Sequence, residues 1–262
     1  FRQIISERLG ISFEEISIVQ GDSDRIETGG GTMGSRSVPV GGSAISATAA
    51  ILIEKAKLKA AEMLETAIDD IEFKNGEFKI VGTDRSESFK SVAQAAAPAD
   101  GSASFDEKES FAPSEATYPN GTHVCELEID EATGTIEVVD YTVVDDFGKT
   151  INPLLLEGQV HGGIAQGLGQ ALLENCAYDA ESGQLIAATF MDYTMPRASN
   201  FPEIRFKRNE VPCLTNPLGI KGAGEAGTGG APAAILNAVN DALSPMGASI
   251  WQMPMTPERI LT

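Results

Sequence analysis

The sequence predicts an α+β protein with mixed or antiparallel sheets, packed helices and two subdomains, 1–112 and 113–262. Three observations support this prediction. Helical and hairpin patterns occur in both halves of the chain. The stretch 98–120 between the halves is poor in large aliphatic residues and carries three prolines, which is typical of a linker or an exposed crossover. No repeat of fixed period is present.

The elements of the first half follow from local signals. Gly10 after an apolar helical stripe ends a first helix, Asn75-Gly76 predicts a hairpin turn, and Ser88 can cap a helix. The expected order is a helix over 1–9, a strand over 16–20, a helix over 43–66, strands over 71–73 and 78–81, and a helix over 88–97.

The second half opens with two strands of alternating polarity around the turn 131–134. Asn152-Pro153 starts a helix, and Pro232 is expected in the first turn of another. The expected order is strands over 123–129 and 135–144, a helix over 153–176, strands over 185–190 and 204–208, a helix over 232–243, and an irregular tail over 251–262.

Composition limits the function classes. The 262 residues carry 19 Lys and Arg against 38 Asp and Glu, so the formal net charge is −19. This charge disfavours binding to nucleic acid and to anionic membranes. The most apolar stretch, 44–53, is too short to span a membrane. Cys125, Cys176 and Cys213 are few and dispersed, which argues against a disulfide framework and favours a reducing, cytoplasmic compartment.

Two glycine clusters match the dinucleotide-binding string GxGxxG, at Gly29-x-Gly31-x-x-Gly34 and Gly222-x-Gly224-x-x-Gly227. The string needs a strand before it, a helix after it and an acidic residue at the end of the next strand, and neither context supplies all three. A nicotinamide- or flavin-binding dehydrogenase module therefore stays a second hypothesis. Plain turns, or backbone N–H cradles for the phosphates of another cofactor, also explain these clusters.

A third cluster of glycines lies inside a predicted helix, over 158–170. Each glycine within a helix costs about 1 kcal/mol relative to alanine, so close helix packing or a ligand must account for them. The sequence leaves these two explanations equally open. Gln166 offers both a hydrogen-bond donor and an acceptor from this helix.

Seven segments in order carry a family resemblance. They are GTMGSRS at 31–37, NP at 152–153, EGQ at 157–159, GIAQGLG at 163–169, DYTMPR at 192–197, GIKGAGEAG at 219–227 and MPMTPER at 253–259. Together they resemble the large, molybdenum-binding subunit of the xanthine dehydrogenase, aldehyde oxidase and aerobic carbon monoxide dehydrogenase family. The resemblance spans nearly the whole chain and is to the C-terminal cofactor-binding domain of that subunit only.

The resemblance implies a fragment of a molybdenum-dependent oxidoreductase, a hydroxylase that takes its oxygen from water. In that family a molybdopterin, here expected in its cytosine dinucleotide form, holds the metal, so no metal ligand is expected from this chain. Glu225 matches the general-base glutamate. The residues that match the cofactor-binding segments are Gly34, Ser35, Arg36, Ser37, Gln166, Gly167, Lys221, Gly222 and Gly224. His123 and Cys125 share one strand face, and we expect them to serve packing rather than a zinc site.

The same resemblance implies partners: the remainder of the large subunit, a flavin-binding medium subunit and a two-cluster iron–sulfur small subunit. The substrate class is an aldehyde, an N-heterocycle or a similar molecule, and the sequence does not select among them. We expect the chain alone to hold no molybdenum cofactor and to be inactive. We also expect the clusters 29–37, 163–169 and 222–227 to converge on one face. A non-catalytic assembly domain with the same fold is the remaining alternative.

Overall fold

A computed structural model describes residues 1–26 and 29–262. The chain forms two compact units: Phe1–Thr117 with Cys213–Ile220, and Tyr118–Pro212 with Lys221–Thr262. The main division thus lies between Thr117 and Tyr118, and one short later segment belongs to the first unit. The division of function between 1–112 and 113–262 stays a prediction.

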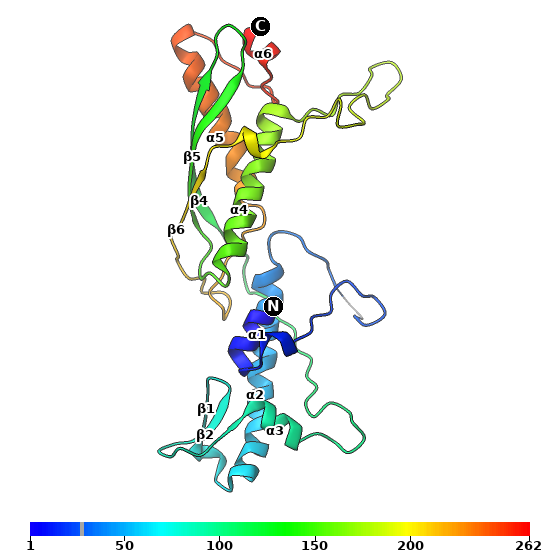
Figure 1. Ribbon diagram of the computed structural model, residues 1–262, viewed down its shortest axis with the longest axis vertical. Helices are drawn as coiled ribbons and strands as arrows, with labels where there is room; N and C mark the ends of the chain where they lie inside the picture. Colours follow the sequence, from blue (N-terminus) through cyan, green and yellow to red (C-terminus); the bar gives the residue numbers. More distant parts are fainter. Residues whose placement is uncertain (27–28) are drawn as a thin grey trace. The chain divides into compact units, whose positions relative to one another are not determined.

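The first unit packs three helices against a small antiparallel sheet of order β1-β2-β3 (Figure 1). Its elements are α1 (Arg2–Leu9), α2 (Ser43–Leu64), β1 (Ile71–Lys74), β2 (Glu77–Ile80), β3 (Ser86–Ser88) and α3 (Phe89–Ala95). One turn of π-helix, Ser37–Gly42, leads into α2. The core joins Leu9, Ala56, Phe78, Phe89 and Val92.

Local signals in this unit act as predicted. Gly10 ends α1 in the left-handed conformation with φ 67°. Asn75 and Gly76 both have positive φ, as the two-residue β1–β2 turn requires. The Ser88 hydroxyl accepts a hydrogen bond of 3.0 Å from the Ser91 N–H and so caps α3. The stretch 98–117 contains no helix or strand, as expected of an exposed connection.

The helix that runs over Ser37–Leu64 is longer than the helix predicted over 43–66, and it is more apolar than expected. By length and composition, it is the one helix in the described part of the chain that could cross a membrane. The expectation that no apolar run reaches this length was wrong. Ala56, Ala60 and Leu64 on this helix are buried in the core of the first unit. A core helix of a globular protein meets the same criteria, so this finding is weak evidence for a membrane span.

The second unit is a three-stranded sheet of order β4-β5-β6 with two helices on one face (Figure 1). Its elements are β4 (Asn120–Ile129), β5 (Ile136–Asp146), α4 (Pro153–Leu168), a π-helical turn at Gly169–Leu173, β6 (Ile204–Arg208), α5 (Ala226–Leu243) and α6 (Pro257–Leu261). β4 and β5 are antiparallel, whereas β5 and β6 are parallel. Tyr141, Val143, Ile164, Leu168 and Ile235 lie in the shared core. The α+β prediction is confirmed.

Four predicted elements differ in the structure. The tail over 251–262 is not irregular throughout, because Pro257–Leu261 form the helix α6. Residues 16–20 form no strand, because no neighbouring strand pairs with them. Residues 185–190 contribute only an isolated bridge between Tyr178 and Leu185. Helix α5 begins at Ala226, so Pro232 lies inside it rather than in its first turn. The glycine-rich turn before Pro232 is helical because it packs closely against α4.

Candidate functional site

The first glycine cluster, 29–37, forms a loop in the first unit. Gly31, Gly34 and Ser35 have φ values of 68°, 58° and 54°. A Cβ added at Gly29, Gly31 or Gly34 would meet no atom within 4 Å. No atom therefore packs against these three glycines on the side that a Cβ would occupy, which leaves room for a ligand beside the loop backbone.

This loop lines a cavity of about 1540 Å³ within the first unit. Hydroxyl groups of Thr32 and Ser37, which are joined by a 3.0 Å hydrogen bond, and the Arg36 side chain line it together with the carboxylates of Asp22 and Glu115. Hydroxyl groups and an arginine are donors that phosphate oxygens use. The donor set and the volume fit a bulky phosphate-bearing cofactor.

In the second unit, helices α4 and α5 approach each other at backbone level. A Cβ on Gly163 would lie 2.9 Å from the Gly227 Cα, and a Cβ on Gly227 would lie 2.4 Å from the Val160 carbonyl oxygen. A Cβ on Gly167 would lie 2.7 Å from the Ala231 Cβ. Helix packing therefore accounts for the missing side chains at Gly163, Gly167 and Gly227. The direct cofactor contact expected of Gly167 stays a prediction.

Other glycines of the same two helices have no such neighbour. A Cβ at Gly158, Gly162 or Gly229 would meet nothing within 4 Å. Gln166 is exposed on α4, and its side-chain oxygen accepts a 3.2 Å hydrogen bond from the Thr228 hydroxyl on α5. Helix packing thus explains Gly163, Gly167 and Gly227 but not these three open glycines, for which a bound ligand remains the alternative explanation.

Glu225 occupies the N-cap position of α5 and is exposed. Two glycines precede it, of which Gly222 is buried and Gly224 is exposed. The Gln159 side-chain amide donates a 3.0 Å hydrogen bond to the Gly224 carbonyl, so α4 holds the chain immediately before Glu225. Small residues therefore precede Glu225, and its expected role as the general base stays a prediction.

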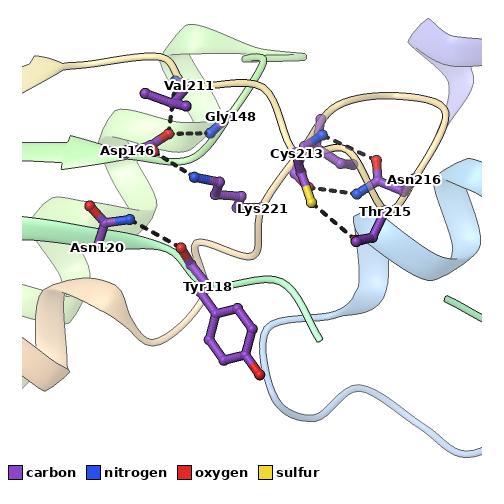
Figure 2. Close-up of polar contacts among 10 residues, drawn as sticks. Tyr118, Asn120, Asp146, Gly148, Val211, Cys213, Thr215, Asn216 and Lys221 are labelled. Atoms are coloured by element: carbon purple, nitrogen blue, oxygen red, sulfur yellow. Dashed lines mark hydrogen bonds and ion pairs between the residues drawn. The ribbon is translucent and has the colours of Figure 1, made fainter. Parts of the chain in front are cut away.

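Lys221 is largely buried and lies beside Asp146 at the end of β5 (Figure 2). Its ammonium group donates to the Asp146 carboxylate at 2.5 Å. Burial opposes ionisation of Asp146, but hydrogen bonds from Lys221, Gly148 and Val211 outweigh it and hold the pKa of the carboxyl below its usual value. This pairing gives Lys221 a structural contact within the second unit, and its expected role toward the cofactor stays a prediction.

Sequence reasoning missed Asp146 and also Asn216. The Asn216 side chain bonds both backbone groups of Ile220: its amide donates to the Ile220 carbonyl at 2.8 Å, and its oxygen accepts from the Ile220 N–H at 3.1 Å (Figure 2). The Cys213 N–H also donates to the Gly219 carbonyl at 3.0 Å, which closes the loop that precedes Lys221. An Asn-Pro pair is a turn signal, but its partner could not be read from the sequence.

The Cys125 side chain packs against the core of the second unit and the His123 side chain is 7% exposed; the expectation that neither serves a zinc site stays a prediction. The His123 Nδ1 lies 2.9 Å from the Tyr141 hydroxyl, and its Nε2 lies 3.7 Å from Asp145. Burial lowers the pKa of His123 and raises that of Cys125 to about 11. Among the described residues, no group of three or more His, Cys, Asp or Glu side chains could hold a metal ion. All three cysteines are free thiols.

Two of the three glycine clusters come together. Segments 163–169 and 222–227 meet where α4 and α5 pack, within the second unit. The cluster 29–37 belongs to the first unit, so its convergence with the other two stays a prediction.

Comparisons with known proteins identify the family of this chain. The family described as "Molybdopterin cofactor-binding domain" matches residues 1–202. The nicotine 6-hydroxylase large subunit of Paenarthrobacter nicotinovorans is 36% identical, and the match covers 99% of this chain and 32% of that subunit. The carbon monoxide dehydrogenase large chain of Hydrogenophaga pseudoflava is 35% identical, with 99% of this chain and 33% of that chain covered.

Solved structures agree in fold. The carbon monoxide dehydrogenase from Oligotropha carboxidovorans matches with a TM-score of 0.91 at 34% identity, over 99% of this chain and 33% of that one. Quinoline 2-oxidoreductase from Pseudomonas putida 86 matches with a TM-score of 0.87 at 37% identity, over 99% and 34% of the two chains. The chain thus spans about a third of the length of these relatives. It belongs to the molybdopterin cofactor-binding domain family, as a part similar to the large subunits of molybdenum-dependent hydroxylases and dehydrogenases.

Proposed function

We propose that this chain is the cofactor-binding part of a molybdenum hydroxylase large subunit and that Glu225 is its general base. The placement of Glu225 carries the proposal: the carboxylate is exposed at the start of α5, directly after Gly222 and Gly224. A general base must come within hydrogen-bond reach of the proton that it accepts, and glycines beside it admit a bulky cofactor.

When bound, the molybdopterin cofactor supplies the two-electron oxidation of a substrate carbon, with water as the oxygen source. Glu225 accepts the proton that this water loses. The loop 31–37 and the Arg36 guanidinium donate to phosphate oxygens of the cofactor, in its cytosine dinucleotide form. Gln166 offers its amide from α4, next to Thr228.

The proposal extends to partners and location. The remainder of the large subunit, a flavin-binding subunit and a two-cluster iron–sulfur subunit complete the enzyme, which carries electrons away from the substrate. Three free thiols agree with a reducing, cytoplasmic compartment. The substrate class is an aldehyde, an N-heterocycle or a similar small molecule. Two similar proteins are named for the N-heterocycles nicotine and quinoline, and another is named an aldehyde oxidoreductase.

The test uses the assembled enzyme that contains this chain. Reduction of an electron-accepting dye is measured with nicotine, quinoline, xanthine, an aromatic aldehyde and carbon monoxide, and the best substrate is carried forward. Glu225→Gln is nearly isosteric but cannot accept the proton. We expect unchanged molybdenum and pterin content and a rate that falls beyond the roughly 10²–10⁴-fold usual for a lost general base.

Glu137→Gln is the matched control, because Glu137 is an exposed carboxylate on β5. We expect this variant to keep the wild-type rate. Single-turnover reduction of the metal centre by substrate separates chemistry from product release. A Glu225→Gln enzyme with full metal content and a rate within a few-fold of wild type would refute the general-base assignment and favour an assembly domain.

A further inference from the structure

We propose that Asp146 is a positioning residue for Glu225: its carboxylate, through Lys221, fixes the glycine-containing segment that leads to the base. The inference rests on the proposed function of Glu225 and adds a residue that lies far from it in sequence. Lys221 and Asp146 are 75 residues apart in the chain. The sequence motif around Glu225 therefore includes Lys221 but not its partner Asp146.

Asp146 holds three chain segments at the end of β5. One of its carboxylate oxygens accepts hydrogen bonds from the backbone N–H groups of Gly148 at 2.8 Å and Val211 at 3.0 Å. The other oxygen accepts from the Lys221 ammonium at 2.5 Å (Figure 2). Lys221 is held a second time, because its own N–H donates to the Phe147 carbonyl at 2.8 Å.

The segment after Lys221 needs such an anchor. Glycine loses more conformational freedom on folding than any other residue, so Gly222 and Gly224 alone would leave the approach to Glu225 loosely defined. From the other side, Gln159 holds the Gly224 carbonyl and the Thr228 hydroxyl bonds the Gly163 carbonyl at 3.1 Å. The Asp146–Lys221 pair therefore anchors the upstream end of a segment whose downstream end is fixed to α4.

Burial strengthens the ion pair between Lys221 and Asp146. The side chains of Lys221 and Asp146 are only 12% and 6% exposed, so water screens their attraction little. The lowered pKa of Asp146 keeps it ionised through the neutral range. Removing one partner of a buried pair leaves the other charge uncompensated, whereas removing both does not. This difference allows positioning to be separated from simple loss of stability.

Three variants of the assembled enzyme test the proposal. Asp146→Asn removes the charge but keeps an acceptor for the backbone N–H groups. The double variant Asp146→Asn with Lys221→Met removes both charges. Asp140→Asn is the matched control, since Asp140 lies on the same strand and pairs with Arg205 at 2.6 Å at an exposed position.

A displacement of the base by about 1 Å can lower the rate about 100-fold. We therefore expect Asp146→Asn and the double variant to lower kcat per bound molybdenum by about 10- to 100-fold, with KM unchanged. Asp140→Asn matches wild type. Hydrogen exchange at residues 221–225 is faster in both Asp146 variants, whereas that of β4 is unchanged.

A double-mutant cycle tests whether Asp146 acts through Glu225. In a Glu225→Gln background, Asp146→Asn should lower the rate no further, because the group that it positions is already inactive. An additive loss overturns the proposal, as does a kcat within about threefold of wild type in the two Asp146 variants. Loss of fold or cofactor in both variants assigns Asp146 to stability alone and also overturns it. A fully active Glu225→Gln enzyme instead refutes the proposed function.

Discussion

Alanine substitutions at the neighbouring residues Gly162 and Gly163 of α4 should have opposite effects on stability. A Cβ at Gly162 would meet nothing within 4 Å, whereas a Cβ at Gly163 would lie 2.9 Å from the Gly227 Cα and the Thr228 nitrogen. Both of these atoms belong to the backbone of α5, so no flexible side chain can move aside. Ordinary contact begins near 3.4 Å, and the two helices must therefore separate by about half an ångström.

Three contributions determine the expected change in the free energy of unfolding of the two variants. Overpacking of this kind costs about 1–3 kcal/mol. The separation also lengthens the 3.1 Å hydrogen bond from Thr228 to the Gly163 carbonyl, which costs about 1 kcal/mol more. Alanine gains about 1 kcal/mol over glycine from helix propensity at either position. We expect Gly163→Ala to destabilise the chain by about 1–3 kcal/mol and Gly162→Ala to stabilise it by up to about 1 kcal/mol.

Calorimetric unfolding of the two variants and the wild type measures this contrast. A domain of this size shifts its Tm by roughly 2–4 °C per kcal/mol, so the two variants should differ by at least about 2 °C. Circular dichroism establishes that both retain their helix content before heating. Equal Tm values, or a Gly163→Ala chain more stable than Gly162→Ala, would refute the reasoning that helix packing requires Gly163.

Three further predictions concern other parts of the chain. Burial raises the pKa of the Asp145 carboxyl from 3.8 to about 6. Between these two pH values the folded state keeps a proton that the unfolded state has lost, so the free energy of unfolding falls as the pH rises from about 4 to 6. Asp145→Asn should therefore be more stable than wild type at pH 8, by on the order of 2–3 kcal/mol, and about as stable as wild type at pH 4. Urea unfolding of both proteins at the two pH values measures this. A stability difference that does not depend on pH would contradict the prediction. Asn152→Ala removes the side-chain oxygen that accepts from Leu155 N–H at 3.0 Å at the start of α4 and should cost about 1 kcal/mol, whereas Asn152→Asp should retain stability in the same unfolding assay. The chain purified alone should contain no stoichiometric molybdenum by elemental analysis, because it spans about a third of its relatives; a molar equivalent of the metal would refute this.

Elements with local signals could be predicted from the sequence. The β1–β2 turn needs two residues with positive φ, and Asn75-Gly76 supplies them. Helix α4 begins where Asn152 provides a cap and Pro153 follows. By contrast, the early start of α5 depends on contact between Gly227 and α4, so the rule that places proline in a first turn gave the wrong boundary.

At the candidate site, too, residues within one motif could be predicted from the sequence, whereas long-range contacts could not. Glu225 and its glycines form a contiguous motif, and a sequence can reveal such a motif directly. The contact between Lys221 and Asp146 joins residues 75 positions apart, and no periodicity or spacing indicates it. Likewise, Gly162 and Gly163 are indistinguishable by composition, and only the direction in which each faces determines which one packing requires.

The mixed strand directions of the second sheet have a consequence for the order of folding. β4 and β5 are joined by a short turn and can pair early, because closing a short loop costs little entropy. β6 pairs in parallel with β5, and Thr142 and its partner Arg205 are 63 residues apart, so the intervening helix and loop must be in place first. We expect pulse-labelled hydrogen exchange during refolding to protect amides of β4 before those of β6. Nascent chains that end before residue 204 would then expose the second edge of β5, which is a template for unwanted strand pairing until β6 covers it.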